Sequence, residues 1–165
     1  IEGYLAATYS SNPGTSFCTG DGVATPCPCG NSSTNGGGCA NGTGNGGVLE
    51  GSGAASVSLD SLVLSATGLV SGQPGLYFQA NNAINGGAGT PFGDGIRCAG
   101  GGVIRLQVAA ADAGGESSTS LNISVKGGAV SGSVFRYQLW YRDPNTSPCG
   151  ANFNLTNGLE VVWQA

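Results

Sequence analysis

The 165-residue chain contains 32 glycines, six cysteines and neither histidine nor methionine, and its 5 basic and 9 acidic residues give a net charge of −4. So few basic residues exclude a nucleic-acid-binding protein, because phosphate binding needs clustered lysine and arginine. No apolar stretch approaches the roughly 20 residues of a membrane-spanning helix, and the glycines lack the collagen triplet, so the composition predicts short strands joined by many turns.

Residues 1–14 are predicted to form a strand arm followed by a linker. Ile1, Leu5 and Tyr9 fall on one face of a period-two alternation, which a turn at Asn12-Pro13-Gly14 ends. We expect this arm to complete the sheet of an identical neighbour by strand donation, with those three side chains in apolar slots, and head-to-tail repetition would build a filament. The alternative is that the arm pairs with its own sheet as the first strand.

The start of the chain and its cysteines also indicate a compartment. Because the chain begins at Ile1 and lacks methionine, we expect that a secretory signal peptide has been removed. An even number of cysteines in a chain this rich in glycine and asparagine predicts three disulfides in an oxidising, extracellular or cell-surface setting. The six are Cys18, Cys27, Cys29, Cys39, Cys98 and Cys149.

Residues 15–47 hold four of the six cysteines and almost nothing apolar. Such a segment keeps its shape only if it is cross-linked, since it has no core to offset the ordering entropy, so we predict a disulfide-stapled loop region. Zinc is the alternative use of the thiols, but Cys27 and Cys29 are spaced C-x-C rather than C-x2-C. We expect Cys98 to pair with Cys149, because both lie at ends of regular strands, and the four early cysteines to pair among themselves. Cys27 and Cys29 are too close in sequence to pair with each other.

Residues 48–165 are predicted to be regular strands. Each of several short runs shows one apolar and one polar face, which indicates antiparallel sheet with a single buried side. The runs are 55–59, 62–66, 76–80, 104–108, 121–125, 135–141 and 159–163. Strands of this length between turns rich in Gly, Asn, Asp and Pro predict one all-β domain over 15–165, an antiparallel β-sandwich of jelly-roll or immunoglobulin-like type, with a barrel as the alternative.

A set of local motifs runs through this domain. It reads CPCGN at 27–31, GCANG at 38–42, LVLSATGL at 62–69, GQPGLYFQ at 72–79, NGGAGTPFGDGIRCAGG at 85–101, WYRDP at 140–144 and FNLTNGLEV at 153–161. The set resembles a Cys/Gly-rich β-domain that recurs in secreted and surface proteins of planctomycete-like bacteria, often at the C-terminus of larger proteins. The resemblance covers 17–165 and implies an extracellular setting and an autonomous β-module, but no activity.

Candidate catalytic and metal-binding residues are few. Without histidine, Ser-His-Asp and Cys-His machinery is absent, and no carboxylate lies in a recognisable acid/base motif, so the sequence predicts a protein that is not an enzyme and needs no cofactor. Asp21 and Asp94, each between two glycines, are candidate calcium ligands; a tight turn is the alternative interpretation of both.

One predicted strand carries a candidate ligand face. Trp140 lies on its polar side with Arg136, Gln138 and Arg142, an arrangement suited to a glycan or another partner; the alternative is that Trp140 packs inward. Trp163 shares a face with apolar neighbours and is predicted to be core. Five sequons are candidate glycosylation sites, at Asn31, Asn41, Asn122, Asn145 and Asn154.

The leading hypothesis from the sequence is an extracellular structural subunit of a surface filament or sheath, assembled from identical copies by donation of the N-terminal strand. The alternative is a monomeric adhesion or glycan-binding module of a secreted bacterial protein. The two differ in what makes the contact, which is the arm in the first and the face around Trp140 in the second.

Overall fold

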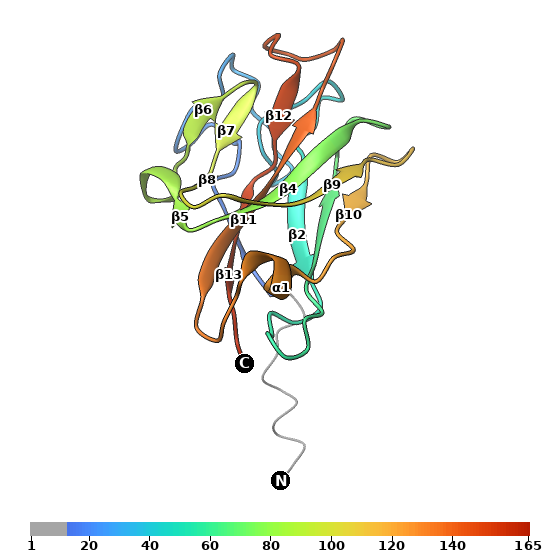
Figure 1. Ribbon diagram of the computed structural model, residues 1–165. Coiled ribbons are helices and arrows are strands. Elements are labelled where there is room, and N and C mark those ends of the chain that lie inside the picture. Colours follow the sequence, from blue (N-terminus) through green and yellow to red (C-terminus); the bar gives the residue numbers. More distant parts are fainter. Residues whose placement is uncertain (1–12) are drawn as a thin grey trace.

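A computed structural model describes residues 13–165, and antiparallel sheets dominate it (Figure 1). The larger sheet has the order β1-β13-β11-β4-β9, and β12 also pairs with β11. Its strands are β1 Thr15–Phe17, β4 Pro74–Ala80, β9 Ile104–Ala110, β11 Val134–Arg142, β12 Phe153–Leu155 and β13 Gly158–Val162. Residues 1–12 are not described, so the expected strand arm lies outside the described part of the chain.

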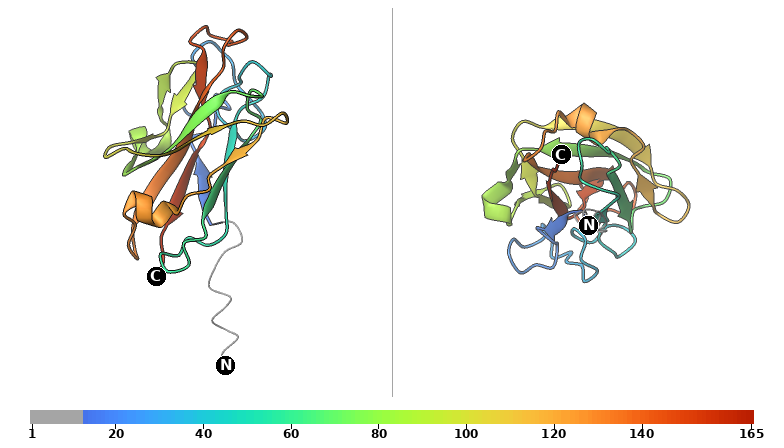
Figure 2. Two further views of the ribbon diagram at one scale, coloured as in Figure 1. Left: turned by 45° about the vertical axis from the view of Figure 1, so that its right-hand side comes forward. Right: turned by 90° about the horizontal axis from the view of Figure 1, so that it is seen from below.

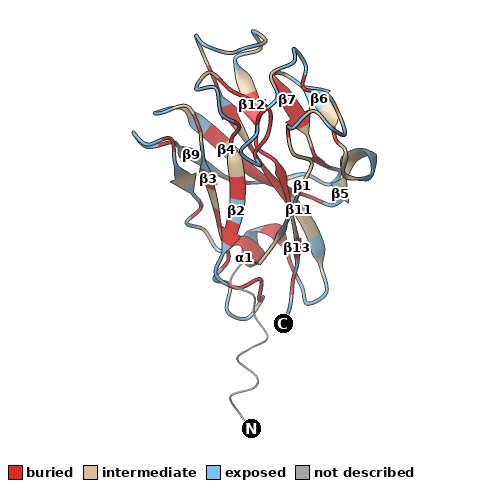
Figure 3. Cartoon of the chain, turned by 180° about the vertical axis from the view of Figure 1, so that it is seen from behind, coloured by how far each residue is buried: buried red, intermediate tan, exposed pale blue. Residues whose placement is uncertain are grey.

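A smaller sheet faces the larger one, which makes the domain a β-sandwich (Figure 2). It has the order β10-β3-β2, built from β2 Val48–Ser52, β3 Val63–Thr67 and β10 Ser117–Ser118. Apolar side chains from both sheets fill the space between them, and Figure 3 shows buried segments on the strands and exposed ones in the loops. The largest buried core residues are Trp163, Tyr77, Tyr137, Tyr141, Leu49, Leu62, Leu64, Ile123 and Leu139.

Two short strand pairs cover part of the outer face of the larger sheet. They are β5 Asn82–Ala83 with β8 Ala99–Gly100, and β6 Thr90–Phe92 with β7 Gly95–Arg97; a 3-10 turn, η2 Ile84–Gly87, follows β5. β7 lies against β12, and β8 lies against β4 and β11. Phe78, Ala99 and Leu155 form a small second apolar cluster there, so this part of the sheet is covered on both faces.

The predicted strand runs are mostly confirmed, with two exceptions. Residues 55–59 form no strand, although Ser56 makes an isolated bridge to Gln164. Residues 121–125 were expected to be a strand, but Ile123–Gly127 is the helix α1. The helix ends where Gly128 adopts a left-handed φ of 66°, which glycine allows at no steric cost, and Ile123 is buried in the sandwich core.

A β-bulge in β9 corrects a further detail of the sequence prediction. Val108 was expected on the apolar face with Ile104 and Leu106. The register along β4 shifts between Tyr77 and Phe78, so that one extra residue of β9 is accommodated. Beyond the bulge the alternation is reversed, and Val108 is 66% exposed on the outer face, while Ala109 packs toward the core.

The disulfide pairing predicted from the sequence is wrong in part. The bridges are Cys18–Cys98, Cys27–Cys39 and Cys29–Cys149, so Cys98 and Cys149 are not partners. Only one bridge joins two of the four early cysteines, although Cys27 and Cys29 are indeed not paired with each other. The prediction assumed a self-contained knot, whereas the loop region lies against the sandwich and is tied to it at two points. Among the described residues, no helix has the length and apolar character to cross a membrane.

Candidate ligand-binding groove

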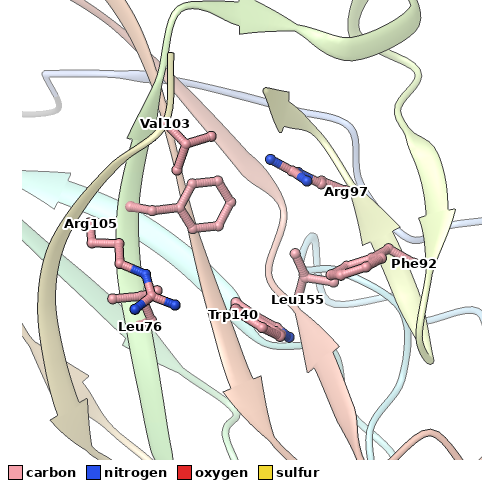
Figure 4. Close-up of a pocket in the computed structure, with 8 residues that line it drawn as sticks. Leu76, Phe92, Arg97, Val103, Arg105, Trp140 and Leu155 are labelled. Atoms are coloured by element: carbon pink, nitrogen blue, oxygen red, sulfur yellow. The ribbon is translucent and has the colours of Figure 1, made fainter. Parts of the chain in front are cut away.

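A groove runs along β4 on the outer face of the larger sheet, away from the sandwich core (Figure 4). Its deeper half encloses about 510 Å³, part of it open to solvent. This half is lined by Leu76, Phe78, Phe92, Arg97, Val103, Arg105, Trp140 and Leu155. The shallower half shares Leu76, Arg105 and Trp140 and continues to Pro74, Val108 and Arg142. We call this surface the groove.

The floor of the groove is an apolar row that crosses four strands. Leu76 on β4 lies opposite Val108 on β9 and opposite Trp140 on β11, and Trp140 in turn lies opposite Leu155 on β12. Residues in register on neighbouring strands present their side chains on the same face. The bulge in β9 is what brings Val108 into this row, because without the extra residue it would point to the core.

One wall of the groove is aromatic. Phe92, on the β6–β7 hairpin, lies 5.9 Å from the ring of Trp140 and 5.2 Å from that of Phe153, measured between ring centroids. The rings of Trp140 and Phe153 meet edge to face at 5.6 Å. At the tip of the hairpin Gly93 has a φ of +60°, and a Cβ there would overlap the Phe153 ring, so only glycine allows this approach. These contacts fix the orientation of the half-buried Trp140.

The rim of the groove is basic. The guanidinium of Arg97 lies 5.9 Å from the centre of the Phe78 ring and 6.0 Å from that of Phe92, and its Nε donates a 3.2 Å hydrogen bond to the Ala99 carbonyl oxygen. Arg105 and Arg142 are exposed. The one ion pair within residues 13–165 is elsewhere, between Arg136 and Glu160 at 2.8 Å, and no carboxylate lines the groove.

The ligand face predicted from the sequence is only partly present. Arg136, Gln138, Trp140 and Arg142 alternate onto the outer face of β11, but only Trp140 and Arg142 line the groove. Gln138 is completely buried under β7 and β8, where its amide bonds to the backbone of Ile96 and Cys98. Trp140 does not belong to the sandwich core, while Trp163 does, as predicted.

Sequence reasoning missed several residues of the groove, among them Leu76, Phe92, Arg97 and Arg105. A signal for the arginines was present, since Arg97 and Arg105 flank a run of glycines at 100–102 that reads as a turn. The groove itself was not readable, because it depends on the bulge in β9 and on the position of the β6–β7 hairpin.

The two candidate calcium ligands are turn and loop residues. The Asp21 carboxylate accepts a 2.9 Å hydrogen bond from the backbone N–H of Val23, two residues on, as in an Asx turn. Asp94 is completely buried, and its two oxygens accept hydrogen bonds from the Ser147 hydroxyl and from the backbone N–H groups of Cys149 and Ala151. Within residues 13–165 no three Cys, Asp or Glu side chains gather as metal ligands would.

Three of the five sequon asparagines use their amide nitrogen inside the fold. Asn41 and Asn154 are buried, and both donate from Nδ2, Asn41 to the Gly68 carbonyl oxygen at 2.8 Å and Asn154 to that of Ala40 at 3.1 Å. Asn31 donates from Nδ2 to two carbonyl oxygens. A glycan on these nitrogens would remove those bonds, so the exposed Asn122 and Asn145 are the sequons that the fold leaves accessible.

Comparisons of the chain with protein-family models, with curated proteins and with solved structures found no match. The resemblance to a recurring Cys/Gly-rich β-domain therefore stays a prediction. A functional assignment has to come from the groove itself.

Proposed function

We propose that this protein is an extracellular binding module that holds a carbohydrate chain in the groove. The observation that carries the proposal is the half-buried Trp140 on the floor of an elongated hollow with an arginine rim. Of the two functions considered from the sequence, adhesion by glycan binding is thus the one that a groove in the described part of the chain supports. The three disulfides support the extracellular setting, since such bridges persist in oxidising compartments.

The chemistry of the groove suits a sugar. A pyranose ring has apolar C–H faces and polar edges, so it packs on an aromatic ring while its hydroxyl groups bond to the rim. Trp140, Leu76 and Val108 supply a continuous apolar strip across neighbouring strands. The described residues that line the groove include no carboxylate and so offer no acid/base pair for glycoside hydrolysis, which supports binding without cleavage.

Trp140→Ala tests this proposal on a glycan array and by titration of the glycans that the wild-type protein retains. We expect a loss of affinity of roughly 5- to 30-fold, because a stacked aromatic ring contributes about 1–2 kcal/mol. Val125→Ala is the matched control, since Val125 is an equally apolar, 75% exposed side chain on α1. Unchanged binding of the Trp140 variant, or retention of no glycan by the wild type, would exclude the proposal.

Trp140 packs against Phe92 and Phe153, so Trp140→Ala could lose binding because the fold is disturbed. A second variant that keeps the aromatic wall intact therefore tests the groove separately. Val108→Asp changes a 66% exposed residue at the other end of the floor. It is expected to weaken binding by a similar factor and to leave the unfolding temperature within a few degrees of the wild type.

Assembly by strand donation remains a second proposal, and one observation favours it. β9 ends the order of the larger sheet, so the described strands pair with it on one side only, and its free edge adjoins the groove. Residues 1–12 of another copy are the proposed donor. Deleting them should convert assemblies into monomers by light scattering and negative-stain microscopy; filaments that persist would exclude donation by this segment.

A further inference from the structure

The basic residues of this acidic protein are concentrated at the groove. The chain has 5 lysines and arginines in all. Arg97, Arg105 and Arg142 line the groove, Arg136 is paired with Glu160, and Lys126 lies in the last turn of α1. Among residues 13–165 no acidic side chain lines the same surface. A protein with a net charge of −4 therefore has a locally positive binding surface.

The guanidinium groups of the rim are available to a ligand. Stacking on Phe78 and Phe92 holds Arg97, and within the described part of the chain its guanidinium donates one hydrogen bond, from Nε to the Ala99 carbonyl oxygen. Arg105 projects from β9 on the other side of the floor from Arg97, with Trp140 below them (Figure 4). A guanidinium presents a planar fork of donors that matches the two oxygens of a carboxylate or sulfate.

The floor of the groove favours a saccharide over an acidic peptide. The floor lies on β9, β4, β11 and β12, whose backbone groups are paired with one another along the row from Val108 to Leu155. A bound peptide usually gains its affinity from main-chain hydrogen bonds to a free strand edge. Among the floor strands β9 ends the sheet order, so its free edge lies at the margin of the groove, and a chain lying across Leu76 and Trp140 would meet only paired backbone. A charged sugar needs only the apolar strip for its ring and donors at the rim for its acid groups.

We infer that the ligand is an acidic polysaccharide, whose carboxylate or sulfate groups are bound by Arg105 and Arg142 while a sugar ring packs on Trp140. This inference rests on the proposed glycan-binding function and specifies its substrate class. Arg97, which lies against the Phe78 and Phe92 rings, contributes positive charge in the deeper half of the groove.

Isothermal titration of the oxidised full chain with matched saccharides tests the inference. Oligogalacturonate carries a carboxylate on each ring, its methyl-esterified form has the same backbone without charge, and dextran sulfate against dextran gives the corresponding sulfate pair. We expect one charged probe to bind at least tenfold more tightly than its neutral counterpart, and its affinity to fall between low salt and about 1 M salt, where the screening length is only about 3 Å.

Charge-removing variants identify the residues. Arg105→Gln and Arg142→Gln change exposed side chains and are each expected to weaken binding of the charged probe about tenfold, with no effect on the neutral one. Lys126→Gln removes the same charge from α1, outside the groove, and should leave both affinities unchanged. Whichever probe pair shows the effect tells whether carboxylate or sulfate is recognised.

The outcomes separate the two proposals. Equal affinity for charged and neutral probes, unaffected by both arginine variants but reduced by Trp140→Ala, would overturn the acidic-ligand inference and leave glycan binding standing. No binding of any saccharide would overturn both. A polyglutamate peptide that binds as tightly as the charged saccharides, with the same dependence on Arg105 and Arg142, would show that the groove accepts acidic peptides and would also overturn the inference.

Discussion

The loop region and the sandwich are stabilised in different ways. Residues 15–17, which were predicted to belong to the loop region, form β1 of the larger sheet, so the loop region is residues 18–47. The loop region, all of it described, contains no strand beyond an isolated bridge between Ala40 and Gly46. Its buried side chains are mostly half-cystines and polar groups, such as Ser33 and Asn41. Two of the three disulfides tie it to the sandwich, at Cys98 and Cys149. The sandwich, by contrast, has a continuous apolar core between two sheets.

Buried polar side chains of the sandwich join the two regions. Asn154, on β12, donates hydrogen bonds to the carbonyl oxygens of Cys39 and Ala40, and Asp143 accepts one from the backbone N–H of Gly42. These side chains give the irregular loop backbone the partners that a strand would find in its neighbour. Glycine-rich chain can therefore be ordered without a core of its own, provided that covalent bonds and side-chain amides replace apolar burial.

The largest expected effect is the loss of the disulfides. In the chain-entropy description, a disulfide stabilises the fold more when it closes a longer stretch of chain. Removing Cys29–Cys149, with a sequence separation of 120, should therefore lower the free energy of unfolding by about 5 kcal/mol. Removing Cys27–Cys39, with a separation of 12, should lower it by about 3 kcal/mol. Guanidinium unfolding of the paired Cys→Ser variants measures both costs. The reverse order would show that the bridges act through native contacts rather than through the unfolded chain.

Full reduction sharpens the same comparison. We expect backbone amides in residues 18–47 to lose more of their protection from hydrogen exchange than those of β4, β11 and β13, because the strands retain an apolar core and the loop region has none. If the strands exchange together with the loop region, the domain is one cooperative unit and the distinction between the two regions fails.

Glycine substitutions in the loop region should give effects of intermediate size. A Cβ on Gly38 would overlap the carbonyl oxygen of Leu155, so Gly38→Ala is expected to cost about 3 kcal/mol through displacement of packed backbone. Gly30 has a φ of +76° and nothing within 4 Å of such a Cβ, so Gly30→Ala should cost only the strain of the left-handed conformation, about 1 kcal/mol. Urea unfolding distinguishes the two. Equal losses would mean that the loop region repacks freely.

Features that depend on local pattern were predictable from the sequence. Alternation identified β3, β4, β9, β11 and β13, because a strand with one face on a core repeats every second residue. The same pattern placed Trp163 in the core, with Leu159 and Val161. The composition of the loops and the positions of the cysteines predicted the disulfide-stapled loop region and the beginning of the regular strands near Val48.

Features that depend on contacts between distant segments were not predictable. Cys18 reaches Cys98 because the loop region lies along β7 and β8, and no local pattern encodes that path. Gln138 has the spacing of an exposed residue, yet the same strands cover it. The bulge at Leu106 reverses the alternation of Val108, which was therefore assigned to the core side. Leu76 and Phe78 were also predicted on the core face of β4, but they lie on its outer face, and Tyr77 between them points into the sandwich core.

Two buried carboxylates at the junction of the two regions, Asp94 and Asp143, are expected to respond differently to replacement by asparagine. Both carboxylate oxygens of Asp94 accept hydrogen bonds. Asp94→Asn replaces one of these oxygens by an NH2 group that would face the same donors, so we expect the free energy of unfolding at pH 7 to fall by roughly 2 kcal/mol. Asp143 is completely buried, and its Oδ1 has no hydrogen-bond partner among the described residues. Asp143→Asn removes a poorly compensated charge, so we expect it to change stability at pH 7 by about 1 kcal/mol or less, without the loss seen for Asp94→Asn.

The pH dependence of stability tests this assignment of Asp143. Burial, aided by the nearby charge of Asp94, raises the pKa of the Asp143 carboxyl in the folded protein. Between the unfolded-state pKa, about 3.9, and the raised folded-state pKa, the folded protein binds more protons than the unfolded chain. Asp143 therefore makes stability decline as pH rises through that window and has no further effect above it. Asp143→Asn should remove this decline, so the unfolding temperature of the variant should rise relative to the wild type from pH 4 toward neutrality. If the unfolding temperatures of the two proteins change with pH in parallel, a partner compensates the charge of Asp143. The Asp143 carboxylate would then be as fully hydrogen-bonded in the folded protein as that of Asp94.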